Sequence, residues 1–259
     1  MVTYVMSDLH GCFDEFQSLL EKIGFTDEDR LILAGDLIER GPKNYEMLRW
    51  LEQKPDNVYP VLGNHENEFA RNVGLMSALC EQLREDPADP DTAAMICGVA
   101  ERKSLFFDYY GCISGLIRDH TVTLNDFTRW ADMFSTWPCQ RSVRIRGREF
   151  IIVHAGYIED LSLLPKLGQY SDLREFNLYA REEAYLYGGR AHTTIISGHT
   201  PTVIRHSFTS NNGYVFRYHD EDRDCVIYDI DCGGVFRYWG EAASRFACIR
   251  LEDEEITYV

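Results

Sequence analysis

TYVMSDLHG (residues 3–11) sets a pattern that two later stretches repeat, LILAGDLIERG (residues 31–41) and VYPVLGNHE (residues 58–66). Each begins with apolar residues and ends with acidic, amide or imidazole side chains beside a glycine. The apolar runs have the length of β-strands. Residues 13–23 carry apolar side chains at helical spacing, and Pro42 suits a first helical turn. This alternation predicts a parallel sheet with covering helices.

The predicted secondary structure changes twice in the rest of the chain, first to helices and then mainly to strands. Residues 67–137 predict a helical insertion with a Pro- and Asp-rich break at residues 86–91, packed beside the strand ends. A hairpin with an Arg146-Gly147 turn follows, and then a helix at residues 172–187. Further strands are expected at residues 194–196, 214–218, 225–230 and 245–251. We expect an α/β fold of two mixed β-sheets flanked by helices, forming one domain over residues 1–259.

Composition excludes several classes of protein. The formal net charge is −16, which argues against general binding of nucleic acid, because that function needs clustered Lys and Arg. No stretch is long and apolar enough to predict a membrane span, and no secretory leader is expected at the N-terminus. The eight cysteines are scattered singly, without a CxxC pair, which favours free thiols in a reducing cytoplasm.

Two later motifs, VHAG (residues 153–156) and SGHTP (residues 197–201), also follow apolar runs. Ligands of α/β sheets bind beyond the carboxyl ends of the strands, so five strand ends should bring their polar side chains to one edge. These side chains are Asp8, His10, Asp36, Asn64, His65, His154 and His199. One such Asp alone is typical of a helix N-cap, and one such His of an ordinary core residue. Together they favour a site for Mn, Fe or Zn.

The series of motifs resembles the signature of the phosphoprotein phosphatases, and most closely their bacterial branch, within the calcineurin-like metallophosphoesterases. The similarity extends nearly end to end. It includes Trp137-Pro, residues 150–156, AREE at residues 180–183, GHTP at residues 198–201 and IDCG at residues 230–233. The resemblance implies a calcineurin-like sandwich of two mixed sheets and a hydrolase that attacks phosphate monoesters with a metal-activated water.

The same resemblance implies a dinuclear metal centre. Asp8 and His10 would hold the first ion, and Asp36 would bridge both ions. The second ion would be held by Asn64, His154 and His199. We expect two divalent ions of manganese, with iron or zinc as alternatives, and no organic cofactor. The chain lacks an HCx5R loop, so no covalent phosphocysteine is expected.

Four more residues have expected catalytic roles. His65 would protonate the leaving oxygen, and Arg40 would bind the phosphate at two points. Arg181 resembles a second phosphate-binding arginine, although an ordinary surface arginine is an equal alternative. Glu39 replaces the family's Asp, which orients the acid histidine, and its extra methylene changes that geometry. Ser7 replaces the first glycine of the opening motif. Glu66 and Glu68 are expected to cap or support the following helix.

The main functional prediction is a serine/threonine protein phosphatase acting on a phosphorylated protein or a small phosphoester. The alternative is a dinucleoside tetraphosphate hydrolase, because symmetrical tetraphosphatases share the DxHGC opening, the RGP at residues 40–42 and the GNH loop. The segments at residues 180–183 and 198–201 favour the phosphatases. A non-catalytic phosphate-binding module is a third reading, supported by the change at Glu39 alone.

Overall fold

The computed structural model describes residues 1–105, 108 and 110–259, and two five-stranded sheets form its centre. The first sheet has the order β10-β9-β1-β2-β3. Its strands are β1 (Thr3–Met6), β2 (Arg30–Leu33), β3 (Val58–Pro60), β9 (Ala247–Arg250) and β10 (Glu255–Tyr258). The strands β1, β2 and β3 are parallel, and β9 and β10 run antiparallel to their neighbours.

The second sheet has the order β4-β5-β6-β8-β7. Its strands are β4 (Gln140–Ile145), β5 (Arg148–Val153), β6 (Thr193–Ser197), β7 (Phe216–Asp220) and β8 (Cys225–Asp229). The central strands β5, β6 and β8 are parallel, and the edge strands are antiparallel. Val5 and Ile32 of the first sheet share one apolar cluster with Ile196 of the second. The two sheets therefore pack face to face as a sandwich.

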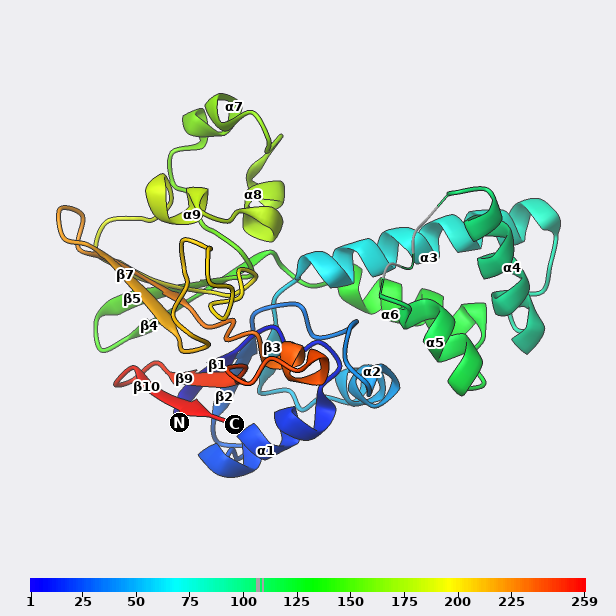
Figure 1. The fold of residues 1–259 in the computed structure, drawn as a ribbon, viewed down its shortest axis with the longest axis horizontal. Coiled ribbons are helices and arrows are strands. Elements are labelled where there is room, and N and C mark those ends of the chain that lie inside the picture. Colours follow the sequence, from blue (N-terminus) through cyan, green and yellow to red (C-terminus); the bar gives the residue numbers. More distant parts are fainter. Residues whose placement is uncertain (106–107, 109) are drawn as a thin grey trace.

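Helices cover the outer face of each sheet, as Figure 1 shows. Side chains alternate along a strand, so Tyr4 and Met6 point away from Val5 and pack with α1 (Phe13–Ile23) and α2 (Asn44–Glu52). The second sheet is covered by α7 (Leu164–Leu167), α8 (Leu173–Tyr179) and α9 (Glu183–Leu186). Both sheets are thus buried on two faces, which leaves their strand ends as the place for a site.

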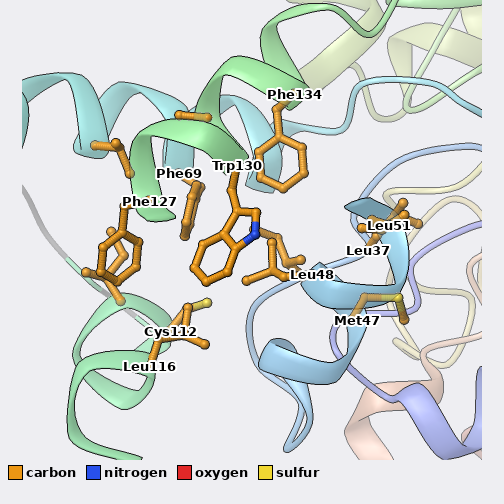
Figure 2. Packing of buried hydrophobic residues seen from close by; sticks show 14 of the residues in the cluster. Leu37, Met47, Leu48, Leu51, Phe69, Cys112, Leu116, Phe127, Trp130 and Phe134 are labelled. Carbon is orange, nitrogen blue, oxygen red and sulfur yellow. The ribbon is translucent and has the colours of Figure 1, made fainter. Parts of the chain in front are cut away.

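A helical lobe leaves the sandwich directly after β3 and extends to one side of the molecule (Figure 1). It consists of α3 (Asn64–Leu83), α4 (Pro90–Arg102), α5 (Cys112–Asp119) and α6 (Leu124–Ser135). Trp130 of α6 is fully buried, and its indole lies among Phe69, Phe127 and Leu48 in Figure 2. Because Leu48 belongs to α2, this packing joins the lobe to the sandwich.

The expected fold class is confirmed, and several elements differ locally from their expected bounds. The helix expected at residues 172–187 is two helices, because Ala180 has an extended backbone with ψ 141°. The helix expected at Pro42 begins at Asn44. The short edge strand β10 was missed, since its four residues continue an acidic run at residues 252–255 and are too few to form an apolar run. Among the described residues, no helix combines the length and apolarity needed to cross a bilayer. The single-domain organisation stays a prediction.

A buried carboxylate connects the start of the lobe to the loop after β2. Glu66 is fully buried, and its two oxygens accept backbone N–H bonds from Gly63, Asp36, Leu37 and Ile38 at 2.7–3.3 Å. Gly63 also approaches this loop so closely that a Cβ there would lie 2.2 Å from the Asp36 nitrogen. The expectation that Glu66 supports the following helix was therefore incomplete, because it also fixes the loop that carries Asp36.

We expect Trp130→Ala to lower the free energy of unfolding by about 3–5 kcal/mol, because it leaves a large cavity between lobe and sandwich. Urea denaturation measures the change. Trp239 is 55% exposed, so Trp239→Ala is the matched control and should change stability by no more than about 0.5 kcal/mol. Equal effects of the two substitutions would contradict the role assigned to Trp130.

We expect Glu66→Gln to destabilise the protein by about 1–3 kcal/mol, since an amide N–H₂ would then face backbone N–H donors. Urea denaturation is again the measurement, and hydrolytic activity should fall with it as the Asp36 loop loosens. Glu81→Gln, the same change at an exposed position of α3, is the control. Wild-type stability in Glu66→Gln would show that the loop is held by other contacts.

Candidate metal centre

The five motif loops meet at one edge of the sandwich, at the carboxyl ends of β1, β2, β3, β5 and β6. Several of the candidate ligands adopt left-handed backbone conformations, with φ of +52° at Asp8, +46° at His10, +54° at Asp36 and +71° at His199. Each such residue costs on the order of 1 kcal/mol or more and persists only when its surroundings impose it. Left-handed backbone at several residues of one edge supports the prediction of a functional site there.

Four of the predicted ligands converge around one point. The Nε2 atom of His154 lies 2.8 Å from Asn64 Oδ1, 3.1 Å from His199 Nδ1 and 3.3 Å from Asp36 Oδ1. These side chains come from α3, the loop after β6 and the loop after β2, with His154 directly after β5. A set of one amide oxygen, one carboxylate oxygen and two imidazole nitrogens suits an intermediate divalent cation. This is the set predicted for the second ion.

The other carboxylate oxygen of Asp36 faces a second group. Its Oδ2 lies 3.8 Å from His10 Nε2 and 3.6 Å from His65 Nε2. Asp36 thus belongs to two groups of donors, each with ligand atoms within 4.8 Å of one another, in the position predicted for a bridging ligand. Asp8, the predicted partner of His10, belongs to neither of these two groups among the described residues, and His65 lies beside His10 instead. Asp8 is buried and accepts the His199 backbone N–H at 3.1 Å.

Backbone carbonyls orient two of the histidines. The Nδ1 atom of His10 lies 3.1 Å from the Ile38 carbonyl, and that of His154 lies 3.0 Å from the Ala34 carbonyl. A carbonyl only accepts, so Nδ1 of each ring must carry the proton that it donates. Each Nε2 then faces the site, with a lone pair when the ring is neutral, as a metal-binding imidazole requires.

The electrostatics of the buried cluster favour cations. Burial and the neighbouring Asp231 raise the pKa of Asp8 well above its usual range. Although burial alone would lower the pKa of His154, the Asp36 carboxylate raises it to about 10. Buried carboxylates therefore draw positive charge to this edge. The donor set, the orientation of the rings and this charge fit a pair of divalent ions, which would replace the ring protons.

His65 lies between two predicted partners. Its Nδ1 is 2.5 Å from Glu39 Oε2, and its Nε2 is 2.9 Å from the Arg40 guanidinium, which also lies 3.0 Å from His10 Nε2. Burial lowers the pKa of His65, but Asp36 and Glu39 outweigh it and raise the pKa. Glu39 and Arg40 have φ of +71° and +66°, so the turned backbone aims both side chains at the histidine.

Arg181 lies at the break between α8 and α9 and reaches the site. Its guanidinium lies 3.3 Å from the His199 carbonyl and 3.4 Å from Thr200 Oγ1. A continuous helix would have changed the direction of this side chain. All ten predicted site residues are therefore brought to one edge of the sandwich.

A cleft of about 530 Å³ opens in front of this edge. Arg40 and Arg181 line it together with residues from the lobe that sequence reasoning missed, namely Arg71, Asn72, Ser104, Leu105 and Tyr110. Arg40 donates to the Tyr110 hydroxyl at 3.2 Å and lies over its ring. These lobe residues carry no motif, so the sequence did not predict them. Only Arg71 had a local signal, because it lies two helical turns after Asn64 and therefore on the same face of the helix.

Curated relatives match parts of the chain. A symmetrical bis(5'-nucleosyl)-tetraphosphatase from Vibrio campbellii is 40% identical over 157 residues, covering 60% of this chain and 45% of the relative. One from Buchnera aphidicola is 41% identical over 99 residues, covering 37% of this chain and 36% of the relative. The matches thus span less than half the length of either relative.

Two solved structures share the fold over the full length of the chain. One, designated a candidate diadenosine tetraphosphatase, has a TM-score of 0.54 and 19% identity, and 92% of it is covered. The other is a serine/threonine phosphatase from Saccharomyces cerevisiae, with a TM-score of 0.51, 13% identity and 79% covered. At these identities the likeness concerns the fold alone.

The family assignment rests on a longer match. The model of the calcineurin-like phosphoesterase family matches residues 1–235, which include every strand and loop that contributes a candidate ligand. Because that match covers most of the chain, the protein belongs to the calcineurin-like metallophosphoesterases, a family of phosphoester hydrolases.

Proposed function

We propose that this protein hydrolyses dinucleoside tetraphosphates symmetrically, releasing two nucleoside diphosphates. The observation that carries the proposal is the 40% identity over 157 residues to a relative named as a symmetrical tetraphosphatase. The main prediction from the sequence was a serine/threonine protein phosphatase, with the tetraphosphatase as its alternative. The curated relatives favour the alternative, and a phosphoprotein substrate has no comparable support.

The cleft adds a physical argument. It is lined by three arginines, Arg40, Arg71 and Arg181, in a chain with 26 basic and 42 acidic residues. Two carboxylates of the cleft have partners, because Glu39 pairs with His65 and Glu68 accepts a hydrogen bond from the Tyr179 hydroxyl. An extended arginine-lined cleft on an acidic protein suits a polyanion longer than a single phosphate.

We assign the metal-holding role to Asp8, His10, Asp36, Asn64, His154 and His199. Two divalent ions, for which we propose manganese with iron or zinc as alternatives, would supply positive charge against the phosphoryl oxygens and acidify the attacking water. Arg40 and Arg181, on either side of the cluster, would grip the phosphate. His65 would hold a proton at Nε2 for the leaving oxygen, once Arg40 turns from that nitrogen to the phosphate.

The chemistry of the leaving group agrees with the change at Glu39. Central cleavage of a tetraphosphate expels a nucleoside diphosphate, whose terminal phosphate oxygen has a pKa of about 6, as in other phosphate monoesters. A serine alkoxide is far more basic and needs proton donation as the bond breaks. A phosphoanhydride substrate therefore tolerates a less well placed acid group than a phosphoserine does.

We expect purified protein, supplied separately with Mn²⁺, Fe²⁺, Zn²⁺ or Mg²⁺, to convert diadenosine tetraphosphate into ADP. Anion-exchange chromatography separates ADP from the ATP and AMP that asymmetric cleavage would give. Asp36→Asn should abolish the reaction, because it removes a carboxylate shared by both donor groups. Turnover of a phosphoserine peptide without turnover of the tetraphosphate would overturn the proposal in favour of a protein phosphatase.

We expect Glu39→Gln to slow hydrolysis of an alkyl phosphate by about 10-fold to 100-fold, since general acid catalysis contributes about 10²–10⁴-fold in all. Hydrolysis of diadenosine tetraphosphate and of an aryl phosphate should change by much less. Steady-state kcat on the three substrates measures the difference. Equal losses on all three would instead assign Glu39 a purely structural role in the loop.

A further inference from the structure

The cleft continues beyond the metal edge along α3. Asn64 and His65 form the first turn of this helix, and Arg71 and Asn72 lie about two turns further on and line the same cleft. A helix rises 1.5 Å per residue, so the backbone of Arg71 stands about 10 Å along the axis from that of Asn64. A single phosphoryl group at the metal edge does not span that distance, but a short chain of phosphates does.

The surroundings of Arg71 leave its charge available. Its side chain is 68% exposed, and it forms an ion pair with Glu68 Oε2 at 3.3 Å, one turn earlier on the helix. Such an exposed pair stabilises a protein little, so a more highly charged phosphate can replace it. The guanidinium therefore presents donors to the cleft and loses little when a ligand takes them.

Glu68 is held in place by the sandwich. The Tyr179 hydroxyl of α8 donates to Glu68 Oε1 at 2.9 Å and lies 3.3 Å from the Asn67 amide. The Arg174 guanidinium donates in turn to Asn67 Oδ1 at 2.8 Å. These contacts join α8 to α3 and so fix the rotation of α3 about its axis. The face of α3 that carries Arg71 is therefore held toward the cleft.

We propose that Arg71 binds the phosphates beyond the one under attack, and so favours polyphosphate substrates over simple monoesters. The class of substrate rests on the proposed function. In this arrangement Arg40 and Arg181 bind the phosphate at the metal edge, and Arg71 binds the phosphates farther along the cleft. Arg71 contacts no reacting atom, and its role is binding and specificity.

The test measures inhibition of aryl phosphate hydrolysis by inorganic tripolyphosphate and by orthophosphate, at constant free metal ion. In Arg71→Ala, the inhibition constant for tripolyphosphate should rise about 10-fold, as expected for loss of a charge-assisted hydrogen bond. The constant for orthophosphate and kcat/KM for the aryl ester should change less than twofold. The tripolyphosphate inhibition constant of Arg71→Lys should lie between those of Arg71→Ala and the wild type. Lysine keeps the positive charge but lacks the paired N–H donors of the guanidinium.

Arg102→Ala, at an exposed arginine of the lobe outside the cleft, is the matched control and should behave as wild type. As a second readout, tripolyphosphate should raise the melting temperature of the wild type more than that of Arg71→Ala. An unchanged tripolyphosphate constant, or equal rises for both inhibitors, would overturn the proposal. None of these measurements requires turnover of a dinucleotide, so they separate the failure of this inference from failure of the proposed function.

Discussion

The carboxylate of Glu66 is the contact on which the site depends. It gathers backbone N–H groups from the loop after β3 and from the loop after β2. Hydrogen bonds to a buried carboxylate are strong, and a buried N–H or carboxylate oxygen without a partner is costly. The bonds to Glu66 therefore fix the two loops relative to each other. That arrangement sets Asp36 against Asn64 and His65, and the left-handed backbone of Asp36 persists because this network holds it.

Short-range patterns predicted the parts of the fold that they control. The apolar runs before Asp8, Asp36 and Asn64 located three strands, and the rule that ligands lie at strand ends brought their side chains together. Local patterns did not reveal β10, whose pairing with β9 comes from the sheet and not from its own sequence. The helix break at Ala180 was hidden for the same reason, because tertiary packing overrides helix propensity.

The residues of the candidate site also differ in how far the sequence predicted them. Its candidate metal ligands were predictable because a metal site requires particular residue types, and these fall in motifs. Only part of the role of Glu66 was predicted, namely its support of the following helix. Its hydrogen bonds to the Asp36 loop were missed, because they go to backbone atoms about thirty residues away in the sequence. The lobe residues that line the cleft, such as Arg71 and Tyr110, carry no motif, since their place in the cleft comes from the packing of the lobe against the sandwich.

The helix α3 supplies Asn64 at its first turn and has 20 residues in all, which extend into the lobe. The helix is about 30 Å long, and its first turn carries a candidate metal ligand. A small tilt of the lobe would displace its tip by several ångströms and disturb Asn64 at the same time. Lobes of different sequence could be exchanged between relatives without disturbing the site only if the first two turns of α3, their Glu66 anchor and the lobe residues that line the cleft were kept. Diversification of this protein by recombination is thus constrained at α3 and at the contacts of Trp130 and Tyr110, whereas exposed lobe positions outside the cleft are freer to vary.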